Sequence, residues 1–478
     1  MNEGKTKQSR MPGMTLENIA RACGGVYVGP EASRQAVIAG AVTDSRQVEK
    51  GYLFIALKGA RVDGHDFIPE VFEKGALAAL VEKEPEPSAG PCIRVASTLE
   101  AMKKLAAFYR QELRIKVVGI TGSVGKTSTK EMIASVLEQK YRVLKTENNH
   151  NNEIGVPLTI FRIREEHEAA VLEMGISDFG EMHRLAEMTR PDICVITNIG
   201  RCHLENLGTR DGILEAKTES FEHLQPEGIA ILNGDDDKLC TKKDVNGRPA
   251  LFYGIGAEAN RSEDGVLMAE KSVYATDVEN LGMEGMRAKI HTPKGEFAAY
   301  IPLAGEHNVY NALAGTAVGL MLDLTLEEIA EGIGAVKTVK GRNNLMEKDG
   351  VTVIDDCYNA NPDSMRASIA VLAHTQGRKI AVLGDMGELG REERSLHRYV
   401  GDAVAKSGID VLFAAGKLAR EYADAAQGSG CEIHYYEDVD AMLPELTACV
   451  KAGDTVLVKA SHFMNFERVV KTLMEEEF

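Results

Sequence analysis

An apolar run that ends in a glycine-rich turn is the feature that most constrains how this chain can fold. Residues 115–120 are mainly apolar and predict a short buried strand, and Gly122 and Gly125 follow it. Both glycines can adopt positive φ and let the main chain approach a ligand without a Cβ atom in the way. From Lys126 onward the apolar residues recur with a helical period. A strand, a glycine turn and a helix N-terminus together predict a cradle for phosphate groups.

Residues 121–127 have the form T-G-x-x-G-K-T, which is shorter than the standard phosphate-loop pattern G-x-x-x-x-G-K-[ST]. The alternative is a Gly-Lys-Thr that occurs by chance, but the strand before it and the helix after it favour a nucleotide site. Lys126 is predicted to reach the terminal phosphates, and the Thr127 hydroxyl to hold Mg²⁺. The residues expected around the nucleotide phosphates are Gly122, Ser123, Val124, Gly125, Lys126, Thr127 and Ser128.

Size and composition predict a soluble protein of several domains. The 478 residues suffice for about three domains, and a hydrophobic content of 44% can supply each with a core. A net charge of −17 with scattered basic residues argues against nucleic-acid binding. The eight cysteines form no C-x-x-C pair, as expected of reduced thiols. The chain shows neither a signal peptide nor an apolar run of membrane length. We therefore expect a cytoplasmic protein without membrane insertion.

The pattern along the chain predicts an α/β protein with three domains. Residues 14–114 show a mixed α/β pattern. Residues 115–340 alternate strands and helices, which is typical of a parallel sheet with right-handed crossovers, although residues 251–302 favour antiparallel hairpins. Residues 341–478 alternate again and predict a smaller, Rossmann-like doubly wound domain.

Two polar residues follow predicted strands of the central domain. Glu173 comes directly after the strand at 169–172, and His203 lies a few residues after the strand at 193–197. In parallel sheets ligands lie beyond the carboxyl ends of the strands, so these side chains can converge with the glycine turn. Taken singly, Glu173 is more simply a solvated carboxylate and His203 a capping residue. Together they form a candidate metal set.

Lys217 lies on the apolar face of a helix predicted over residues 212–224. Ile213, Leu214, Phe221 and Leu224 form the apolar stripe, and Lys217 falls on it at helical spacings from all four. A lysine in that position is costly unless it is paired, neutralised or used in chemistry. The alternative is a side chain that extends past the stripe so that its ammonium group reaches solvent.

Six motifs occur in order at residues 121–127, 148–157, 173–175, 198–203, 216–219 and 307–308. Together they resemble the ATP-dependent Mur ligases of peptidoglycan synthesis, and the resemblance covers nearly the whole chain. Two later motifs, at residues 356–362 and 383–389, are similar to those of the family member that adds D-alanyl-D-alanine to UDP-N-acetylmuramoyl tripeptide.

The resemblance implies an ATP-dependent peptide ligase that uses two Mg²⁺ ions. It assigns catalysis to Lys126, Glu173, His203 and Lys217, and the metal ions to Thr127, Glu173, His203 and Lys217. In this family the lysine matching Lys217 is carbamoylated. The resemblance also places adenine at Asn308, the γ-phosphate at Arg342 and the ribose at Asp356. The substrate-binding residues that it implies are Asp44, Ser45, Arg46, Gly64, His65, Asn149, Asn359 and Asn361.

The implied reaction begins with transfer of a phosphoryl group from ATP to the tripeptide carboxylate, giving an acyl phosphate. The amine of D-alanyl-D-alanine then displaces phosphate, with no protein nucleophile. Both substrates would bind to one chain, which suggests a monomer. The third residue of the tripeptide, lysine or diaminopimelate, stays open.

Two alternatives remain at this point. The first is a related ligase, either folylpolyglutamate synthase or the tripeptide-forming Mur ligase, which would share the ATP site and use another amine. The tripeptide-forming ligase usually carries an Asp-Asn-Pro-Arg run, and this chain lacks one. A non-enzymatic nucleotide switch would not need Glu173, His203 and Lys217 together. Two positions depart from the family pattern: residues 459–463 read K-A-S-H-F instead of a K-G-S-R-like run, and Cys202 replaces the usual alanine.

Overall fold

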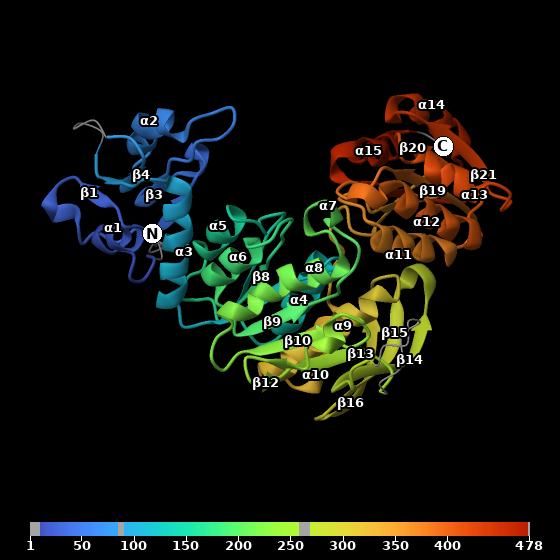
Figure 1. Ribbon diagram of the computed structural model, residues 1–478, viewed down its shortest axis with the longest axis horizontal. Helices are drawn as coiled ribbons and strands as arrows, with labels where there is room; N and C mark the ends of the chain where they lie inside the picture. Colours follow the sequence, from blue (N-terminus) through green and yellow to red (C-terminus); the bar gives the residue numbers. More distant parts are fainter. Residues whose placement is uncertain (1–9, 85–89, 258–267, 477–478) are drawn as a thin grey trace, which may run out of the picture.

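The computed structural model describes residues 10–84, 90–257 and 268–476, and Figure 1 shows three lobes that follow one another along the chain. The N-terminal lobe (blue) and the C-terminal lobe (orange and red) lie at opposite ends of the central lobe (green and yellow). Each lobe is built around its own sheet. Within the described ranges, none of the helices has the length and apolar character needed to span a bilayer.

The N-terminal lobe contains a five-stranded sheet. Its strands are β1 (Val26–Val28), β2 (Gly40–Val42), β3 (Tyr52–Ile55), β4 (Ala78–Val81) and β5 (Cys92–Arg94), and its helices are α1 (Leu16–Cys23), α2 (Ile68–Glu73) and α3 (Thr98–Glu112). The strand order is β1-β5-β4-β3-β2, and only β1 is antiparallel to its neighbour.

Helix α3 connects the N-terminal lobe to the central one. It packs against α1 on one side and against helices of the central lobe on the other. The buried Tyr109 donates a hydrogen bond from its hydroxyl to the Ile163 carbonyl at 2.6 Å, and Arg110 donates from Nε to the Thr189 carbonyl at 2.9 Å. One hydrophobic core therefore runs through both lobes.

The central lobe holds a nine-stranded sheet, with the order β16-β15-β14-β13-β10-β9-β6-β8-β7. Its strands are β6 (Lys116–Thr121), β7 (Val143–Lys145), β8 (Ala169–Glu173), β9 (Ile193–Ile196), β10 (Ile229–Asn233), β13 (Leu251–Ile255), β14 (Val273–Asn280), β15 (Met286–Thr292) and β16 (Gly295–Ile301). Its helices are α4 (Lys126–Leu137), α5 (Gly155–Ile160), α6 (Glu181–Thr189), α7 (Leu204–Leu207), α8 (Arg210–Thr218), α9 (His307–Met321) and α10 (Leu326–Gly334). A separate antiparallel pair consists of β11 (Asp244–Val245) and β12 (Arg248–Pro249).

Alternate residues of the central strands face opposite layers, as the two-residue repeat of a strand requires. Val118 and Ile120 of β6 belong to the core under α4 and α9, whereas Val117 belongs to the core shared with the N-terminal lobe. Burial on both faces explains why the central parallel strands β6, β8 and β9 are almost continuous apolar runs, whereas β14, β15 and β16 are partly exposed.

The sequence prediction for residues 251–302 is wrong in part. Strand β13 is parallel to both β10 and β14, so it extends the parallel sheet, and only β14, β15 and β16 pair in antiparallel fashion. The helix predicted over residues 212–224 is also shorter than expected. Helix α8 ends at Thr218, and the chain continues as a 3₁₀ turn, η4 (Glu219–His223).

The C-terminal lobe is a doubly wound six-stranded sheet. Its strands are β17 (Asn344–Lys348), β18 (Val351–Asp355), β19 (Arg378–Gly384), β20 (Val411–Ala415), β21 (Glu432–Tyr436) and β22 (Asp454–Lys459), and its helices are α11 (Pro362–Ala373), α12 (Glu393–Lys406), α13 (Arg420–Ala426), α14 (Val439–Cys449) and α15 (Glu467–Glu475). The order is β17-β18-β22-β19-β20-β21, with all pairs parallel except β17 and β18. The predicted α/β fold class, with a parallel central sheet and a Rossmann-like last unit, is confirmed.

Candidate active site

The glycine turn after β6 has the predicted backbone conformation. Gly122 and Gly125 have φ of 145° and 83°. A Cβ atom on Gly122 would lie 1.9 Å from the Thr197 hydroxyl oxygen, so no other residue fits there without displacing the loop. Helix α4 begins at Lys126, and its first main-chain N–H groups face the ligand side of the turn, where an anion is favoured.

The chain after β9 holds this phosphate loop in place. Asn198 accepts a hydrogen bond at its side-chain oxygen from Val124 N at 3.0 Å, and donates from Nδ2 to the Val124 carbonyl at 3.0 Å. The Thr197 hydroxyl donates to the same carbonyl at 2.6 Å. Lys126 turns back and donates from Nζ to the Gly122 carbonyl at 2.9 Å. The loop is thus rigid before any nucleotide binds.

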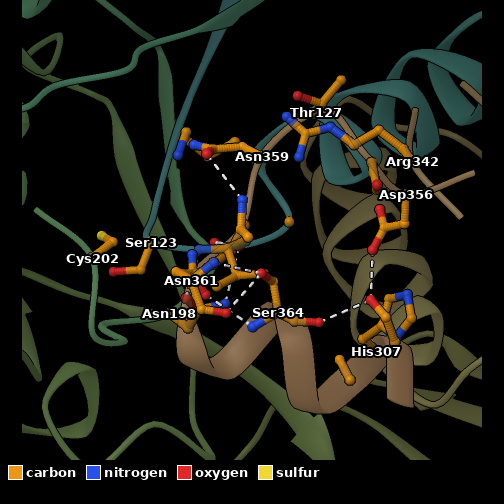
Figure 2. A pocket seen from close by; sticks show the side chains of 18 of the residues that line it. Ser123, Thr127, Asn198, Cys202, His307, Arg342, Asp356, Asn359, Asn361 and Ser364 are labelled. Atoms are coloured by element: carbon orange, nitrogen blue, oxygen red, sulfur yellow. Dashed lines mark hydrogen bonds between the residues drawn. The ribbon is translucent and has the colours of Figure 1, made fainter. Parts of the chain in front are cut away.

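The phosphate loop opens into a cavity of about 600 Å³ at the junction of the central and C-terminal lobes. A cavity of this size suits a nucleotide-sized ligand. Figure 2 shows that Thr127 of the central lobe and Arg342 and Asp356 of the C-terminal segment reach the same hollow. The predicted site residues that line it are Ser123, Val124, Gly125, Lys126, Thr127, Ser128, His203, Arg342, Asp356, Asn359 and Asn361.

Glu173 lies beside the phosphate loop because β6 and β8 are parallel and in register, with Ile120 opposite Glu173. Its carboxylate is buried, and Oε1 accepts a hydrogen bond from Asn151 Nδ2 at 2.8 Å. Oε2 is also buried and has no hydrogen-bond partner among the described residues. A solvated carboxylate is therefore the wrong interpretation of Glu173.

Lys130 is a residue near Glu173 that the sequence analysis missed. It is buried, and its Nζ donates to the Thr146 carbonyl at 2.6 Å and lies 3.1 Å from Glu131 Oε1 and 4.0 Å from Glu173 Oε2. The pattern that drew attention to Lys217, a lysine on the buried face of a predicted helix, is also present at Lys130.

Lys217 is fully buried, as its place on the apolar stripe predicted. Its Nζ has no hydrogen-bond partner in the described part of the chain. Burial lowers the pKa of Lys217 from 10.5 to about 8, and the nearby Lys126 ammonium lowers it further, against an opposing effect of Cys202. The alternative, an ammonium group that reaches solvent, is wrong.

His203 faces the C-terminal lobe. It has a left-handed backbone, with φ of 52°, and its side chain makes no hydrogen bond to cap α7. Its Nδ1 lies 2.5 Å from Glu388 Oε2. This contact lowers the pKa of the Glu388 carboxyl. Cys202, the departure from the family pattern, is buried and lines the cavity, and nothing in the structure explains the substitution.

Asp356 forms a buried ion pair with Lys459, 103 residues further along the chain. Asp356 Oδ2 lies 2.5 Å from Lys459 Nζ and accepts a hydrogen bond from the Ser368 hydroxyl at 2.5 Å. Burial lowers the pKa of Lys459, and Asp356 opposes that effect. The Arg342 guanidinium lies over the Tyr358 ring, 4.0 Å from its centroid, which holds the side chain at the cavity.

The other predicted residues fall in three places. Asn308 is buried in α9, donates to the Ala304 carbonyl at 2.8 Å, and lines a second hollow of about 40 Å³ that shares Ser128 and Arg342 with the main cavity. Asn361 caps α11 through a hydrogen bond from Ser364 N at 2.9 Å. Asn149 is exposed and lines neither hollow, although its neighbour Asn151 contacts Glu173.

The five substrate candidates of the N-terminal lobe do not line the cavity. Asp44 accepts hydrogen bonds from Arg46 N and Nε, both at 2.9 Å, and these hold the pKa of its carboxyl at about 2. His65 is buried: its Nδ1 lies 2.6 Å from Asp63 Oδ1, and its Nε2 accepts from Glu82 N at 2.9 Å. Both loops are therefore well ordered. The candidates are Asp44, Ser45, Arg46, Gly64 and His65.

Comparison with known proteins gives matches along the whole chain. Three family models match: the Mur ligase family catalytic domain at residues 37–118, the Mur ligase middle domain at 120–319, and the Mur ligase glutamate ligase domain at 341–462. The UDP-N-acetylmuramoyl-tripeptide--D-alanyl-D-alanine ligase of Bacillus subtilis (strain 168) is 38% identical and covers 96% of this chain and 98% of its own length. The chain belongs to the Mur ligase family. A Mur ligase of the same name from Escherichia coli (strain K12) is 35% identical, over 97% of this chain and 99% of that one.

Solved structures of Mur ligases agree with this placement. MurF from Acinetobacter baumannii superposes with a TM-score of 0.85 at 35% identity, over 97% of this chain and 99% of that one. MurF ligase from Thermotoga maritima in complex with ADP gives a TM-score of 0.78 at 32% identity, over 91% and 97%. A folylpolyglutamate synthase from Mycobacterium tuberculosis is 15% identical with a TM-score of 0.61, so it shares the fold alone.

Proposed function

We propose that this chain joins D-alanyl-D-alanine to UDP-N-acetylmuramoyl tripeptide at the expense of ATP. The observation that carries the proposal is its 35–38% identity, over almost its full length, to relatives that bear the name of this ligase. The cavity supports it, because a phosphate loop from the central lobe and polar loops from the C-terminal lobe meet there. We assign residues 14–114 to the uridine-linked substrate, 115–340 to ATP and 341–478 to the dipeptide.

ATP is expected to bind with its phosphates on the loop at 122–128. The main-chain N–H groups at the start of α4 and the Lys126 ammonium would meet the β- and γ-phosphates, and Arg342 would approach the γ-phosphate from the C-terminal side. Asn308, in the wall of the second hollow, is the residue that we assign to the adenine, and that hollow of about 40 Å³ would have to widen to admit the base. Asp356 Oδ2 is paired with Lys459, and Oδ1, which accepts from Asn343 N at 3.2 Å, would use its second lone pair for the ribose.

The residues around the phosphate loop also fit Mg²⁺. The Thr127 hydroxyl lines the cavity, and Glu173 Oε2 is a buried oxygen without a hydrogen-bond partner in the described part of the chain, with the Lys130 ammonium 4.0 Å away. His203 also lines the cavity, although as a nitrogen donor it is a weaker ligand for Mg²⁺ than the two oxygens. When bound, Mg²⁺ would neutralise charge on the transferring phosphoryl group.

Lys217 is suited to carbamoylation. With a pKa lowered to about 8, a substantial fraction of its amine is neutral near pH 7 and can act as a nucleophile. The Nζ lone pair would form a bond to the carbon of CO₂ and a proton would leave, so that a carboxylate replaces the buried ammonium. This change would supply a further oxygen ligand for Mg²⁺ and remove the cost of an unpartnered buried cation.

The chemistry then needs only positioning and charge neutralisation. The tripeptide carboxylate attacks the γ-phosphorus in line and ADP departs, with Lys126 and Arg342 stabilising the charge on the phosphoryl oxygens. The dipeptide amine then attacks the acyl carbon, phosphate leaves with the electron pair of the broken C–O bond, and the proton that the amine loses passes to the departing phosphate or to solvent. Closure of the two lobes around the cavity would keep water from the acyl phosphate. We place the reaction in the cytoplasm and one chain at each active site.

Phosphate release from ATP tests the function. The assay is run with UDP-N-acetylmuramoyl tripeptide carrying lysine or diaminopimelate, with and without D-alanyl-D-alanine. We expect phosphate release to depend on the dipeptide and a UDP-linked pentapeptide to be detected by mass spectrometry. Lys126→Ala should abolish both. Release driven instead by glutamate, lysine or diaminopimelate as the amine would assign the chain to another ligase of the family.

A further inference from the structure

A second group of ligating side chains lies outside the cavity. His183 is in the first turn of α6, and Glu222 and His223 end the 3₁₀ turn η4 that follows α8. One donor atom from each residue lies within 4.8 Å of the other two. Within the described ranges, no other three His, Cys, Asp or Glu side chains bring their donor atoms so close together. None of the three lines the cavity at the phosphate loop.

The backbone holds these side chains in position. Glu219 of η4 accepts hydrogen bonds from Gly180 N at 2.9 Å and from His183 N at 3.1 Å, which fixes the start of α6 against the turn. His183 Nδ1 lies 2.6 Å from Glu222 Oε2, and the two imidazole rings meet edge to face with their centroids 4.6 Å apart. A ligand at this point would need little rearrangement of the main chain.

The group offers a cation both a carboxylate and an imidazole nitrogen that is not already hydrogen-bonded. His223 Nε2 is buried and has no hydrogen-bond partner in the described part of the chain. Glu222 is exposed and gives a path from solvent. The hydrogen bond between His183 and Glu222 is an ordinary surface contact, but it does not account for the unpartnered nitrogen of His223 beside it.

We propose that His183, Glu222 and His223 bind a divalent transition-metal ion, preferentially Zn²⁺, at a site separate from the ligase centre. Two imidazole nitrogens and one carboxylate oxygen are a donor set typical of zinc, with a water molecule in the fourth position. Mg²⁺ prefers oxygen ligands alone and is a poor competitor here. The ion would take the place of the proton between His183 and Glu222. It would also tie α6 to the turn that directly follows the helix of Lys217.

The test is a metal titration of the full-length protein after removal of metals with a chelator and desalting. Excess Mg²⁺ and ADP are included so that the ligase centre is occupied. Co²⁺ serves as the spectroscopic probe, because its visible absorption reports coordination by nitrogen and oxygen, and Zn²⁺ is titrated by calorimetry. The variants are His183→Ala, His223→Ala and Glu222→Gln, the last of which keeps the shape of the side chain.

His434→Ala is the matched control. His434 also lies between two glutamates, 2.8 Å from Glu432 and 2.8 Å from Glu445, but in the C-terminal lobe and without a second histidine. The wild-type protein and the control are expected to bind one Zn²⁺ ion more than His183→Ala and His223→Ala. The affinity of Glu222→Gln for Zn²⁺ should be reduced by about tenfold or more. Zn²⁺ should also raise the thermal midpoint of the wild type and not of His183→Ala.

Dipeptide-dependent activity at saturating Mg²⁺ shows that each variant is folded, since none of the three residues lines the cavity. Equal Zn²⁺ stoichiometry and affinity in wild type and all variants would overturn the proposal. So would the absence of Co²⁺ absorption in the wild type.

Discussion

Two lysines inside the central lobe differ in what surrounds their ammonium groups. Lys130 donates to the Thr146 carbonyl and has the Glu131 carboxylate 3.1 Å away, whereas Lys217 Nζ has no hydrogen-bond partner among the described residues. A buried ammonium group without a charged or hydrogen-bonding partner lowers stability. A buried ammonium group next to carboxylates instead holds those carboxylates in place. We therefore expect opposite consequences when each charge is removed.

Replacing Lys217 with methionine should stabilise the fold. The unfolded lysine has its usual pKa of 10.5 and the folded one a pKa of about 8, so at about pH 7 the variant should gain about 3 kcal/mol in free energy of unfolding, in CO₂-free buffer. The folded state binds fewer protons than the unfolded state, so the gain is full below the folded pKa and shrinks as the pH rises toward 10.5. Urea unfolding at about pH 7 and about pH 9.5 measures this. A gain that does not change with pH would contradict the argument, and ligase activity should be lost in either case.

Replacing Lys130 with methionine should impair catalysis through Glu173. The variant removes the cation 4.0 Å from the buried Glu173 carboxylate, whereas Glu131 keeps Lys145 at 2.6 Å. Breaking a buried pair on one side typically costs about 3–5 kcal/mol. We expect kcat to fall by about tenfold or more and the Mg²⁺ concentration at half-maximal rate to rise. Lys145→Met is the matched control, because Lys145 pairs with the same Glu131 at 2.6 Å but is partly exposed. Equal effects of the two substitutions would rule out a positioning role for Lys130.

At the scale of elements, the phosphate loop depends on a glycine that has no room for a side chain. Gly122→Ala would place Cβ against the Thr197 hydroxyl, which holds Val124, so the loop must shift. We expect ATP affinity, measured by calorimetry, to fall by about a hundredfold because the N–H cradle is displaced. Gly408→Ala is the control, since Gly408 also has positive φ, 64°, but nothing within 4 Å of the added Cβ. It should lower stability by about 1 kcal/mol and leave ATP affinity unchanged. Unchanged ATP affinity in Gly122→Ala would show that the loop adapts.

The strand, turn and helix around Gly122 were predictable because their signals are local: an apolar run, two glycines and a change of period. The burial of Lys217 was predictable for the same reason. The direction of β13 was not, because an apolar run of five residues pairs equally well with a parallel or an antiparallel neighbour. The edge strand β17 was missed because its residues are only half-buried and show no clear alternation.

Contacts between distant parts of the chain were out of reach of the sequence. Nothing around Asp356 indicates that its partner is Lys459, and nothing around His203 points to Glu388. Both pairs exist because the C-terminal lobe lies against the central one, and residue patterns within a lobe carry no information on that arrangement. The sequence therefore predicted the candidate residues of each lobe and not how they pair across the cavity.

At the scale of the whole molecule, the two junctions between lobes differ in kind. The N-terminal and central lobes share a hydrophobic core through α3. The C-terminal lobe meets the central lobe through polar contacts and a small apolar one. Arg201 N donates to Asp363 Oδ2 at 2.8 Å, and Glu205 N donates to the Glu388 carbonyl at 3.2 Å. The apolar contact is made by Leu204, Met283 and Ala304 of the central lobe. Polar junctions between domains permit relative motion, so the C-terminal lobe is the one expected to open and close.

Weakening this polar junction should open the nucleotide-free protein. The double variant Asp363→Ala/Glu388→Ala removes the carboxylates that face Arg201 and His203, and we expect the radius of gyration in small-angle scattering to rise by about 1 Å or more. A non-hydrolysable ATP analogue should reverse the change, because a nucleotide bound in the cavity would contact both the phosphate loop and Arg342, which line it together. The apparent KM for ATP should rise more than kcat falls, since the open state must close before reaction.

Asp402→Ala/Asp424→Ala is the control for that experiment. It removes the same charge from exposed positions on α12 and α13. If the control and the junction variant scatter alike, the polar contacts do not hold the lobes together. A difference between the two would mean that the carboxylates at the junction hold the lobes together. Because Glu388 is one of them, His203 would have to leave it before it could bind a metal ion, and closing the lobes would then compete with freeing His203.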